Sequence, residues 1–366
     1  MTVLTLRELN RATLARQSLL SRSRMSVVEA LEHLVGLQAQ TPHSWYVGLW
    51  TRLAGFEAED AAKLLAGREA VRIALMRSTI HFVTARDAVW LRPLVQPVIE
   101  RSTNGAFGKD LKGVDREALT ADGRELVDSA PRTPAELGKL LAERWPGRDP
   151  LALSQAIRMW LPLVQVPPRG VWGRSGATAH TTTDAWLGRP LATDATPDEL
   201  VLRYLAAFGP ASVRDMQTWC GLTRLSEVAT RLGEGGRLAV FTDEQSRVLY
   251  DLPDAPRPPA DTPAPVRFLY DFDNLLLSHA DRSRVITAEY FSQGFSPHGP
   301  MPSMVLIDGF TGAHWRIARA RGTATMRVKP FTPLSPAVRA EVEREGAGLL
   351  AFTDPTAVHD VQWLPH

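Results

Sequence analysis

Cysteine is almost absent from this chain of 366 residues, which contains only Cys220. A single thiol excludes an intramolecular disulfide and any zinc site built from several cysteines, so we expect Cys220 to be a small core residue. No apolar run of the chain approaches the ~20 residues that a membrane-spanning helix needs. The first five residues lack the pattern of a signal peptide. These absences predict a cytoplasmic protein.

Lysine is also scarce, because it occurs only five times and arginine supplies nearly all the positive charge. The planar guanidinium of arginine binds phosphate with two parallel hydrogen bonds. The formal net charge is only +2, so the whole chain carries no basic signal for nucleic acid. Acidic residues are missing, however, from two arginine-containing windows, residues 156–183 and 314–331. This segregation predicts local anion-binding stripes on a nearly neutral protein.

The order of the predicted elements indicates an α+β fold with repeated modules. In three successive segments, short helices precede a pair of strands, which is the plan of a winged helix, a variant of the helix-turn-helix. We expect these modules at residues 1–130, 131–192 and 193–253. A proline-rich linker follows at residues 253–265, and residues 266–366 form a small C-terminal β-rich domain with one helix near residues 336–345.

Several helix starts are marked by capping boxes, in which Ser or Thr precedes an acidic residue by three positions. These boxes begin at Thr5, Ser26, Thr133 and Thr196. The predicted wing strands cover residues 71–75 and 79–83, 163–166 and 170–173, and 238–241 and 248–252.

The segment Gln38-Ala39-Gln40-Thr41-Pro42 lies between two predicted helices. In an extended segment, side chains at i and i+2 point to the same side, so Gln38 and Gln40 would project together. Pro42 disfavours a helical Thr41 and suits the first helical position, which predicts that Thr41 is the N-cap of the next helix. The pair then offers two neutral amides to one target, although a solvated or capping use of such glutamines is more common.

A second group of polar residues follows the linker and includes Asp271, Asp273, His279 and Asp281. Carboxylates and imidazole can ligate a metal, but the spacing matches no HExxH or EF-hand motif. We favour a hydrogen-bonded structural network, with Arg282 and Arg284 reaching phosphates, and expect neither a metal nor a cofactor. Two further residues carry single expectations: His81 should be buried or part of the wing, and Trp315 is a weak candidate for stacking on nucleic acid.

Five segments together resemble one family over essentially the whole chain. They are Gly36-Leu37-Gln38-Ala39-Gln40-Thr41-Pro42, Met76-Arg77-Ser78-Thr79-Ile80-His81, Arg169-Gly170-Val171-Trp172-Gly173, the run from Asp271 to Arg282, and the run from Ile307 to Arg316. The chain is similar to the AlkZ/YcaQ-type winged-helix DNA glycosylases. The resemblance implies tandem winged helices that form a concave DNA-binding surface, with Gln38 and Gln40 as the catalytic residues. It also implies excision of N7-alkylated purines and unhooking of interstrand crosslinks made by natural products. The broader YcaQ branch has an acid at the second motif position, so Gln40 points to the AlkZ side.

Two amides suit this chemistry. Cleavage of a glycosidic bond passes through an oxocarbenium-like state at C1′, and an N7-alkylated purine is already cationic and leaves as a neutral base. What remains is to place water against C1′, and an amide can accept a hydrogen bond from that water and donate another to the sugar. We expect Gln38 and Gln40 to orient the water jointly. Because amides do not titrate, the rate should lack an acid limb, and the scarcity of lysine disfavours a lyase step.

The predicted partner is double-stranded DNA that carries N7-alkylpurine lesions or crosslinks, bound by a monomer. We expect contacts from a hairpin tip at residues 308–312 and from the following residues: Arg77, Arg282, Arg284, Thr311, His314 and Arg316. Two alternatives stay open at this point. One is a non-catalytic winged-helix DNA- or drug-binding protein, and the other is a metal-dependent nuclease that uses Asp271, Asp273 and Asp281.

Overall fold

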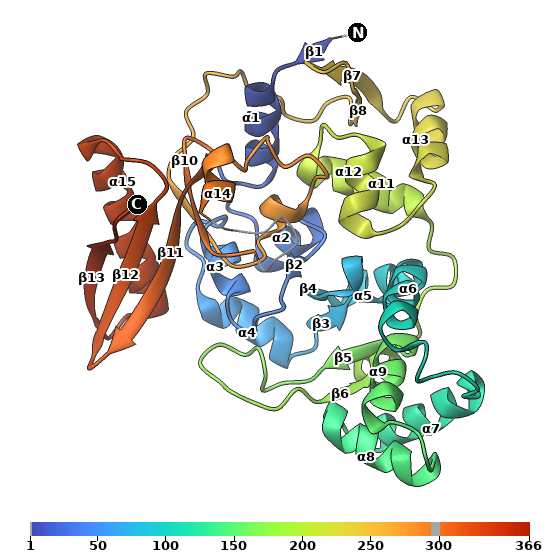
Figure 1. Ribbon diagram of the computed structural model, residues 1–366. Coiled ribbons are helices and arrows are strands. Elements are labelled where there is room, and N and C mark those ends of the chain that lie inside the picture. Colours follow the sequence, from blue (N-terminus) through green and yellow to red (C-terminus); the bar gives the residue numbers. More distant parts are fainter. Residues whose placement is uncertain (1, 294–300) are drawn as a thin grey trace.

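The computed structural model describes residues 2–293 and 301–366. Within these residues the fold is α+β, with three sheets and helices packed around them (Figure 1). No helix in the described part of the chain is long and apolar enough to cross a membrane.

The sheet that carries the glutamine motif has the strand order β2-β4-β3-β5-β6. Strands β2 (Leu37–Gln38), β3 (Ala70–Ala74) and β4 (Ile80–Thr84) come from the N-terminal segment. Strands β5 (Leu163–Gln165) and β6 (His180–Thr182) come from the next predicted module. Because β3 pairs antiparallel with both β4 and β5, the first two predicted wings belong to one sheet.

The tight connection between β3 and β4 is the short helix η1 (Met76–Ser78). Arg77 and Ser78 both have a positive φ, at 56° and 60°. Non-glycine residues adopt this left-handed conformation rarely, and here it turns the chain sharply between two buried strands. The predicted strand–turn–strand around Met76-Arg77-Ser78 is therefore confirmed.

Several helices of the first half contact strands of this sheet, and three helices of this half begin at predicted capping boxes. Capping boxes at Thr5 and Ser26 start α1 and α2, and the box at Thr133 starts α8. The remaining helices of this half begin without a two-way serine or threonine box. The bounds are α1 (Leu6–Arg16), α2 (Val27–His33), α3 (Trp45–Trp50), α4 (Ala58–Ala66), α5 (Ala85–Leu94), α6 (Gln96–Phe107), α7 (Arg116–Ser129), α8 (Pro134–Arg144), α9 (Pro150–Trp160) and α10 (Thr183–Leu187).

The third predicted module consists of three helices and a ribbon. Helices α11 (Pro197–Phe208), α12 (Val213–Cys220) and α13 (Leu225–Glu234) precede the antiparallel pair β7 (Ala239–Asp243) and β8 (Val248–Asp251). The N-terminal strand β1, formed by only two residues (Val3–Leu4), adds in parallel to β7. Cys220 is buried in this region, as predicted.

The C-terminal part holds a five-stranded sheet in the order β13-β12-β11-β10-β9, drawn in orange and red in Figure 1. Helix α15 packs against β9 and β12, and the two short helices η2 and α14 precede β10. The bounds are β9 (Arg267–Leu269), η2 (Asn274–Leu277), α14 (Ala288–Ser292), β10 (Met304–Ile307), β11 (Phe310–Ala320), β12 (Thr323–Pro330), α15 (Pro336–Thr353) and β13 (Val358–Trp363).

One hydrophobic core lies beneath the glutamine motif and joins both ends of the chain. Trp45 and Tyr46 of α3 pack in the same cluster as Phe268 of β9, Tyr270 and Met326 of β12. The C-terminal sheet is thus part of the scaffold on which the N-terminal motif rests.

Three local predictions are wrong. Residues 170–173 form turns instead of a strand, because Gly170 and Gly173 have positive φ and the Gly170 carbonyl accepts a hydrogen bond from the Tyr46 hydroxyl. Strand β5 pairs with β6 in their place. Thr41 is not an N-cap, since its hydroxyl donates to Asp271 and α3 begins only at Trp45. Thr196 precedes α11, but its side chain makes no capping hydrogen bond.

Candidate active site

Gln38 ends strand β2 and is fixed at its backbone by residues more than 200 positions away. Its N–H donates to Oδ1 of Asn274 over 3.1 Å, and its carbonyl accepts from the Tyr270 hydroxyl over 2.9 Å. The Nδ2 group of Asn274 donates to the Gly36 carbonyl over 2.7 Å. Across the sheet, Gln38 pairs with His81 of β4. The motif therefore lies on a rigid strand, clamped from the C-terminal segment.

The side chain of Gln38 is buried and is oriented by Arg77 from the β3–β4 turn. Nη2 of Arg77 donates to Oε1 of Gln38 over 2.7 Å, while Nη1 donates to the Trp219 carbonyl over 2.5 Å. Burial lowers the pKa of Arg77 to about 10, which leaves the guanidinium charged at neutral pH. A charged donor at this distance makes a strong hydrogen bond, so the amide of Gln38 is held in one orientation.

Gln40 is exposed, and its amide is also held by a backbone donor. The N–H of Ile80 donates to Oε1 of Gln40 over 3.2 Å. Gln38 and Gln40 each accept a hydrogen bond from an N–H donor. The accepting atom must be the amide oxygen, so these contacts distinguish Oε1 from Nε2 in both side chains. Each amide keeps its NH₂ group and one lone pair of its oxygen for other partners.

Ala39 anchors the connector between the two glutamines. It is fully buried, its N–H donates to the Ile80 carbonyl over 2.7 Å, and its carbonyl accepts from Nη2 of Arg72 over 2.7 Å. Burial lowers the pKa of Arg72 to about 10. Among the described residues Arg72 forms no ion pair with a carboxylate, and two of its three side-chain nitrogens have no hydrogen-bond partner. An uncompensated buried cation therefore lies behind the motif.

The acidic residues after the linker support the motif. Asp273 forms a buried ion pair with Arg52, with N–O distances of 2.7 and 2.9 Å. Asp271 accepts from the Thr41 hydroxyl, next to Gln40. Asp281 instead forms an ion pair with Arg247, which takes part in neither of these two contacts. The predicted structural network is thus confirmed for Asp271 and Asp273.

The alternative metal site does not fit this arrangement. In residues 2–293 and 301–366, no three side chains of His, Cys, Asp and Glu are close enough to hold a metal ion. His279 is buried, and its Nε2 lies 3.1 Å from the Phe208 carbonyl. Burial and the charge of Arg284 lower the pKa of His279, which favours its neutral form.

The residues predicted to contact DNA occupy different environments. Arg77 lies at the site, but two of its nitrogens are used by Gln38 and Trp219. Arg284 is buried and donates to the Pro210 carbonyl over 2.8 Å. Thr311 is buried too, and its hydroxyl accepts from the N–H of Thr287. The interior positions of Arg284 and Thr311 do not fit contacts to DNA.

The other predicted contacts remain near the surface. Arg316 is exposed on β11, and His314 lies two residues earlier on the same face of the strand. Burial and the positive charges of Arg316 and Lys329 lower the pKa of His314. Arg282 is partly buried, and Nη1 lies 3.7 Å from the Met301 sulfur.

The hairpin tip at residues 308–312 does not project from the protein, which corrects the predicted contact with a DNA groove. Asp308 forms ion pairs with Arg7 and Arg11 of α1. The Gly309 carbonyl accepts from Asn10 over 2.8 Å, and a Cβ at Gly309 would come within 2.6 Å of Asn10. Trp315 is likewise buried, and its indole N–H donates to the Leu269 carbonyl over 2.8 Å, so it cannot stack on a base.

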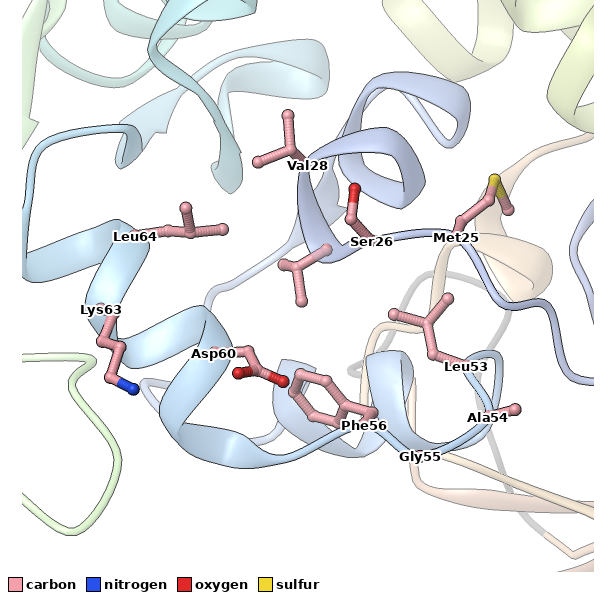
Figure 2. A pocket seen from close by; sticks show the side chains of 11 residues that line it. Met25, Ser26, Val28, Leu53, Ala54, Gly55, Phe56, Asp60, Lys63 and Leu64 are labelled. Carbon is pink, nitrogen blue, oxygen red and sulfur yellow. The ribbon is translucent and has the colours of Figure 1, made fainter.

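Two cavities differ in their relation to the motif. A pocket of about 380 Å³ lies between α2, α4 and the loop before α4, where Val28, Leu53 and Phe56 contribute to a largely apolar lining (Figure 2). Neither glutamine lines it. A smaller cavity of about 120 Å³ is lined by Gln40 together with Ser78, Arg158 and His180. Only the smaller cavity is continuous with the motif.

The sequence indicated the glutamines but missed most of the groups that hold them. Arg72 lies in the strand pattern Ala-Val-Arg-Ile-Ala, where an arginine between buried apolar residues is the only available signal. Asn274 belongs to the polar segment that the sequence singled out, from Asp271 to Arg282, and Tyr270 directly precedes that segment. Their contact with Gln38 depends on tertiary packing across more than 200 residues.

A family model supplies the class of this protein, since the model for DNA glycosylase AlkZ-like proteins matches residues 31–352. The match covers most of the chain, so the protein belongs to the AlkZ-like DNA glycosylase family and is an enzyme that hydrolyses N-glycosyl bonds. Among known proteins, it is similar to the interstrand DNA cross-link repair glycosylase of Streptomyces sahachiroi. The two are 25% identical over 360 residues, which cover 91% of this chain and 92% of the relative.

A solved structure agrees with the fold. The Streptomyces sahachiroi DNA glycosylase AlkZ aligns with a TM-score of 0.76 at 21% sequence identity, over 99% of this chain and 100% of that one. At this level of identity the likeness shows a common fold.

Proposed function

We propose that this DNA glycosylase is monofunctional and releases N7-alkylated purines, including those that form interstrand crosslinks. The name of the Streptomyces sahachiroi relative, an interstrand DNA cross-link repair glycosylase, supports the crosslink as a substrate. Such repair would protect DNA against bis-alkylating natural products, in the cytoplasm where bacterial DNA is found.

The observation that carries this proposal is that both amides of the motif are held by N–H donors, and that Gln40 lines a cavity. Gln38 and Gln40 leave a connector two residues apart, and each has its carbonyl oxygen engaged by an N–H donor. Each can still accept one hydrogen bond from water and donate from its NH₂ group. Water held in this way would face C1′ without a search for the reactive geometry.

The contacts of the motif favour a leaving group that needs no protonation. Arg77 holds the side chain of Gln38 and Arg72 holds the Ala39 carbonyl, and neither guanidinium is an acid that could protonate a leaving base. The nearest contacting carboxylate, Asp271, is engaged by the Thr41 hydroxyl. An N7-alkylated purine leaves as a neutral base, so catalysis reduces to placing water and stabilising the oxocarbenium-like state. A normal purine, which needs an acid, should stay uncleaved.

Duplex DNA would be bound by a monomer built from three winged-helix modules at residues 1–130, 131–192 and 193–253 and the β-rich domain at residues 266–366. In this proposal the modules form a concave surface around Gln38 and Gln40. Arg316, His314 and Arg282 would contact phosphates on this surface. The exposure of Arg316 on β11 supports its assignment.

The test uses a duplex with one N7-methylguanine, incubated with the wild-type protein, Gln38→Ala or Gln40→Ala, and then treated with hot alkali. Wild type should leave an abasic site that alkali cleaves, and each variant should lose this activity while it still binds DNA. EDTA should leave the rate unchanged, whereas a metal-dependent nuclease would be inactivated. Tight binding by wild type without any abasic sites, across several alkyl groups, would instead support a non-catalytic binding protein.

A further inference from the structure

The small cavity beside Gln40 contains polar atoms that have no hydrogen-bond partner among the described residues. Its volume is about 120 Å³, and Ile80 and Met159 provide apolar wall. Gln40, Ser78, Arg158 and His180 provide the polar lining. We propose that this cavity is a phosphate subsite, in which one phosphodiester group of the lesion-bearing strand is bound by Arg158 and Gln40. This inference rests on the proposed DNA substrate.

Within the part of the chain that the structure describes, Arg158 is a cation without a counter-ion. It lies near the end of α9, and Nη1 donates only to the neutral side chain of Gln155, over 2.9 Å. Among the described residues it forms no ion pair, and its Nε is buried without a hydrogen-bond partner. No carboxylate lines the cavity. This partly buried guanidinium has lost hydration and gained a neutral partner but no counter-charge, which an anionic ligand would supply.

His180 adds a second unsatisfied group. It is 3% exposed, and its Nδ1 has no hydrogen-bond partner. Burial and the nearby Arg158 lower the pKa of His180 to about 3, so the imidazole is neutral. The neutral imidazole brings no negative charge that would repel phosphate, and in one tautomer its N–H lies on the unpartnered Nδ1.

The charge of the lining selects the class of ligand. A cationic alkylpurine in this cavity would be repelled by Arg158, whereas a phosphodiester would be attracted. Gln40 uses its carbonyl oxygen on the N–H of Ile80, so its NH₂ group remains as a donor to an anion. The volume corresponds to roughly four water molecules, which is enough for the oxygens of one phosphate. A purine cation is thus excluded from the cavity and left outside it.

The subsite would set the position of the reacting sugar. A phosphate held by Arg158 lies one sugar away from C1′ along the strand, and the same Gln40 that donates to the phosphate would face the attacking water. Gln40 would therefore couple strand position to chemistry. This also explains why residues 156–183, which include Arg158 and His180, contain no acid.

The test measures binding to DNA that cannot be cleaved, with 2′-fluoro-N7-methylguanosine as the lesion analogue. Arg158→Gln should bind this duplex about tenfold more weakly and should reduce the slope of log K against log salt by about 0.9. Arg158→Lys should recover most of the affinity. Arg148→Gln is the matched control, because Arg148 precedes α9 and donates only to backbone carbonyls; it should behave as wild type.

A methylphosphonate scan then locates the phosphate. Neutralising one phosphate beside the lesion should weaken wild type and should cause no further loss in Arg158→Gln. An unchanged salt slope in Arg158→Gln, or additive losses at every position, would overturn the subsite, and so would a loss of thermal stability without a loss of affinity. Because the measurement needs no cleavage, failure of the glycosylase assay leaves it intact, and the two proposals can fail separately.

Discussion

The side chain of Gln38 depends on a single guanidinium for its orientation. Replacing Arg77 with Met removes the donor to Oε1 of Gln38. A hydrogen bond to a charged group contributes about 1.5–3 kcal/mol, so kcat on an N7-methylguanine duplex should fall about 10- to 100-fold. The Kd for DNA should change little, because Arg77 acts through Gln38.

The control for this prediction is Arg101→Met, because Arg101 is exposed on α6 and donates only to the Gly221 carbonyl. It should retain wild-type kcat. Single-turnover rates measure the effect on the chemical step, and fluorescence anisotropy measures the effect on the Kd for DNA. A weaker Kd with unchanged kcat in Arg77→Met would assign Arg77 to phosphate binding and would contradict its positioning role.

His81 should make the stability of the protein depend on pH. Burial, together with the charge of Arg77, lowers the pKa of His81 to about 3, whereas an unfolded chain has a histidine pKa of about 6.5. The unfolded state therefore binds more protons between these values. This contribution to stability is complete above pH ~6.5 and is lost as the pH falls toward 3.

Urea unfolding at a series of pH values tests this prediction. The free energy of unfolding should decline less steeply below pH ~6.5 in His81→Asn than in wild type, because asparagine does not titrate. Other buried histidines, His180 and His279, remain in both proteins and cancel in the comparison. Parallel curves would show that His81 is not the titrating group.

At the residue scale, the sequence indicates which residues serve the site better than it predicts whether a polar residue is buried or exposed. The i, i+2 spacing and the family resemblance together indicated Gln38 and Gln40, and His81 is buried as expected. Arg284 and Thr311 carry the same chemical groups as surface DNA ligands, but they are buried, and composition does not distinguish the two positions. Burial of a polar side chain depends on partners from other elements, such as Pro210 for Arg284.

Among the elements, the residue before η2 is joined to the segment after α3 by the buried ion pair between Asp273 and Arg52. Asp273→Asn leaves Arg52 buried without its carboxylate, which should lower the free energy of unfolding by about 3–5 kcal/mol. Asp281→Asn is the matched control, because Asp281 pairs with Arg247 at an exposed position, and its cost should stay within about 1 kcal/mol. Chemical denaturation of both variants gives the comparison. Similar losses would mean that the Arg52 pair does not stabilise this junction.

The loop between β5 and β6 supports the motif through Arg72. Gly170 has φ +90°, and a Cβ there would lie 2.7 Å from Cδ of Arg72, the residue that binds the Ala39 carbonyl. Gly170→Ala should therefore cost about 1–3 kcal/mol in stability and lower the glycosylase rate. Gly173→Ala has a similar positive φ of +69° but no neighbour within 4 Å, so it isolates backbone strain. Equal glycosylase rates for Gly170→Ala and Gly173→Ala would show that the position of Arg72 does not affect catalysis.

Element prediction succeeded where the signal is local and failed where it is not. The capping boxes at Ser26 and Thr133 start helices as expected. The box at Thr196 has the same residues, but its side chain does not cap the helix. The strand predicted at residues 170–173 has suitable apolar residues, yet Tyr46 binds the Gly170 carbonyl, and β6 takes the place beside β5. The sequence does not show which of two possible partners a backbone carbonyl or a strand will bind.

The whole molecule should unfold in one transition, because α1 ties distant segments together. Asn10 of α1 donates to the carbonyls of Arg284 and Gly309 over 2.6 and 2.8 Å. Asn10→Ala would leave these buried acceptors unsatisfied, at a cost of about 1–3 kcal/mol. Tryptophan fluorescence and far-UV circular dichroism should shift together. Asn104→Ala, at an exposed position of α6, is the control; separate transitions in wild type would contradict the prediction.

The clamp on Gln38 has a consequence for the order in which the protein is made. During synthesis the catalytic pair emerges first, but Tyr270 and Asn274 follow more than 230 residues later. At about 5–20 residues per second, a ribosome needs on the order of ten seconds or more to deliver them. A nascent chain, or one that terminates early, therefore contains the glutamines without the groups that position them. The catalytic pair can therefore be positioned only after synthesis has passed Asn274.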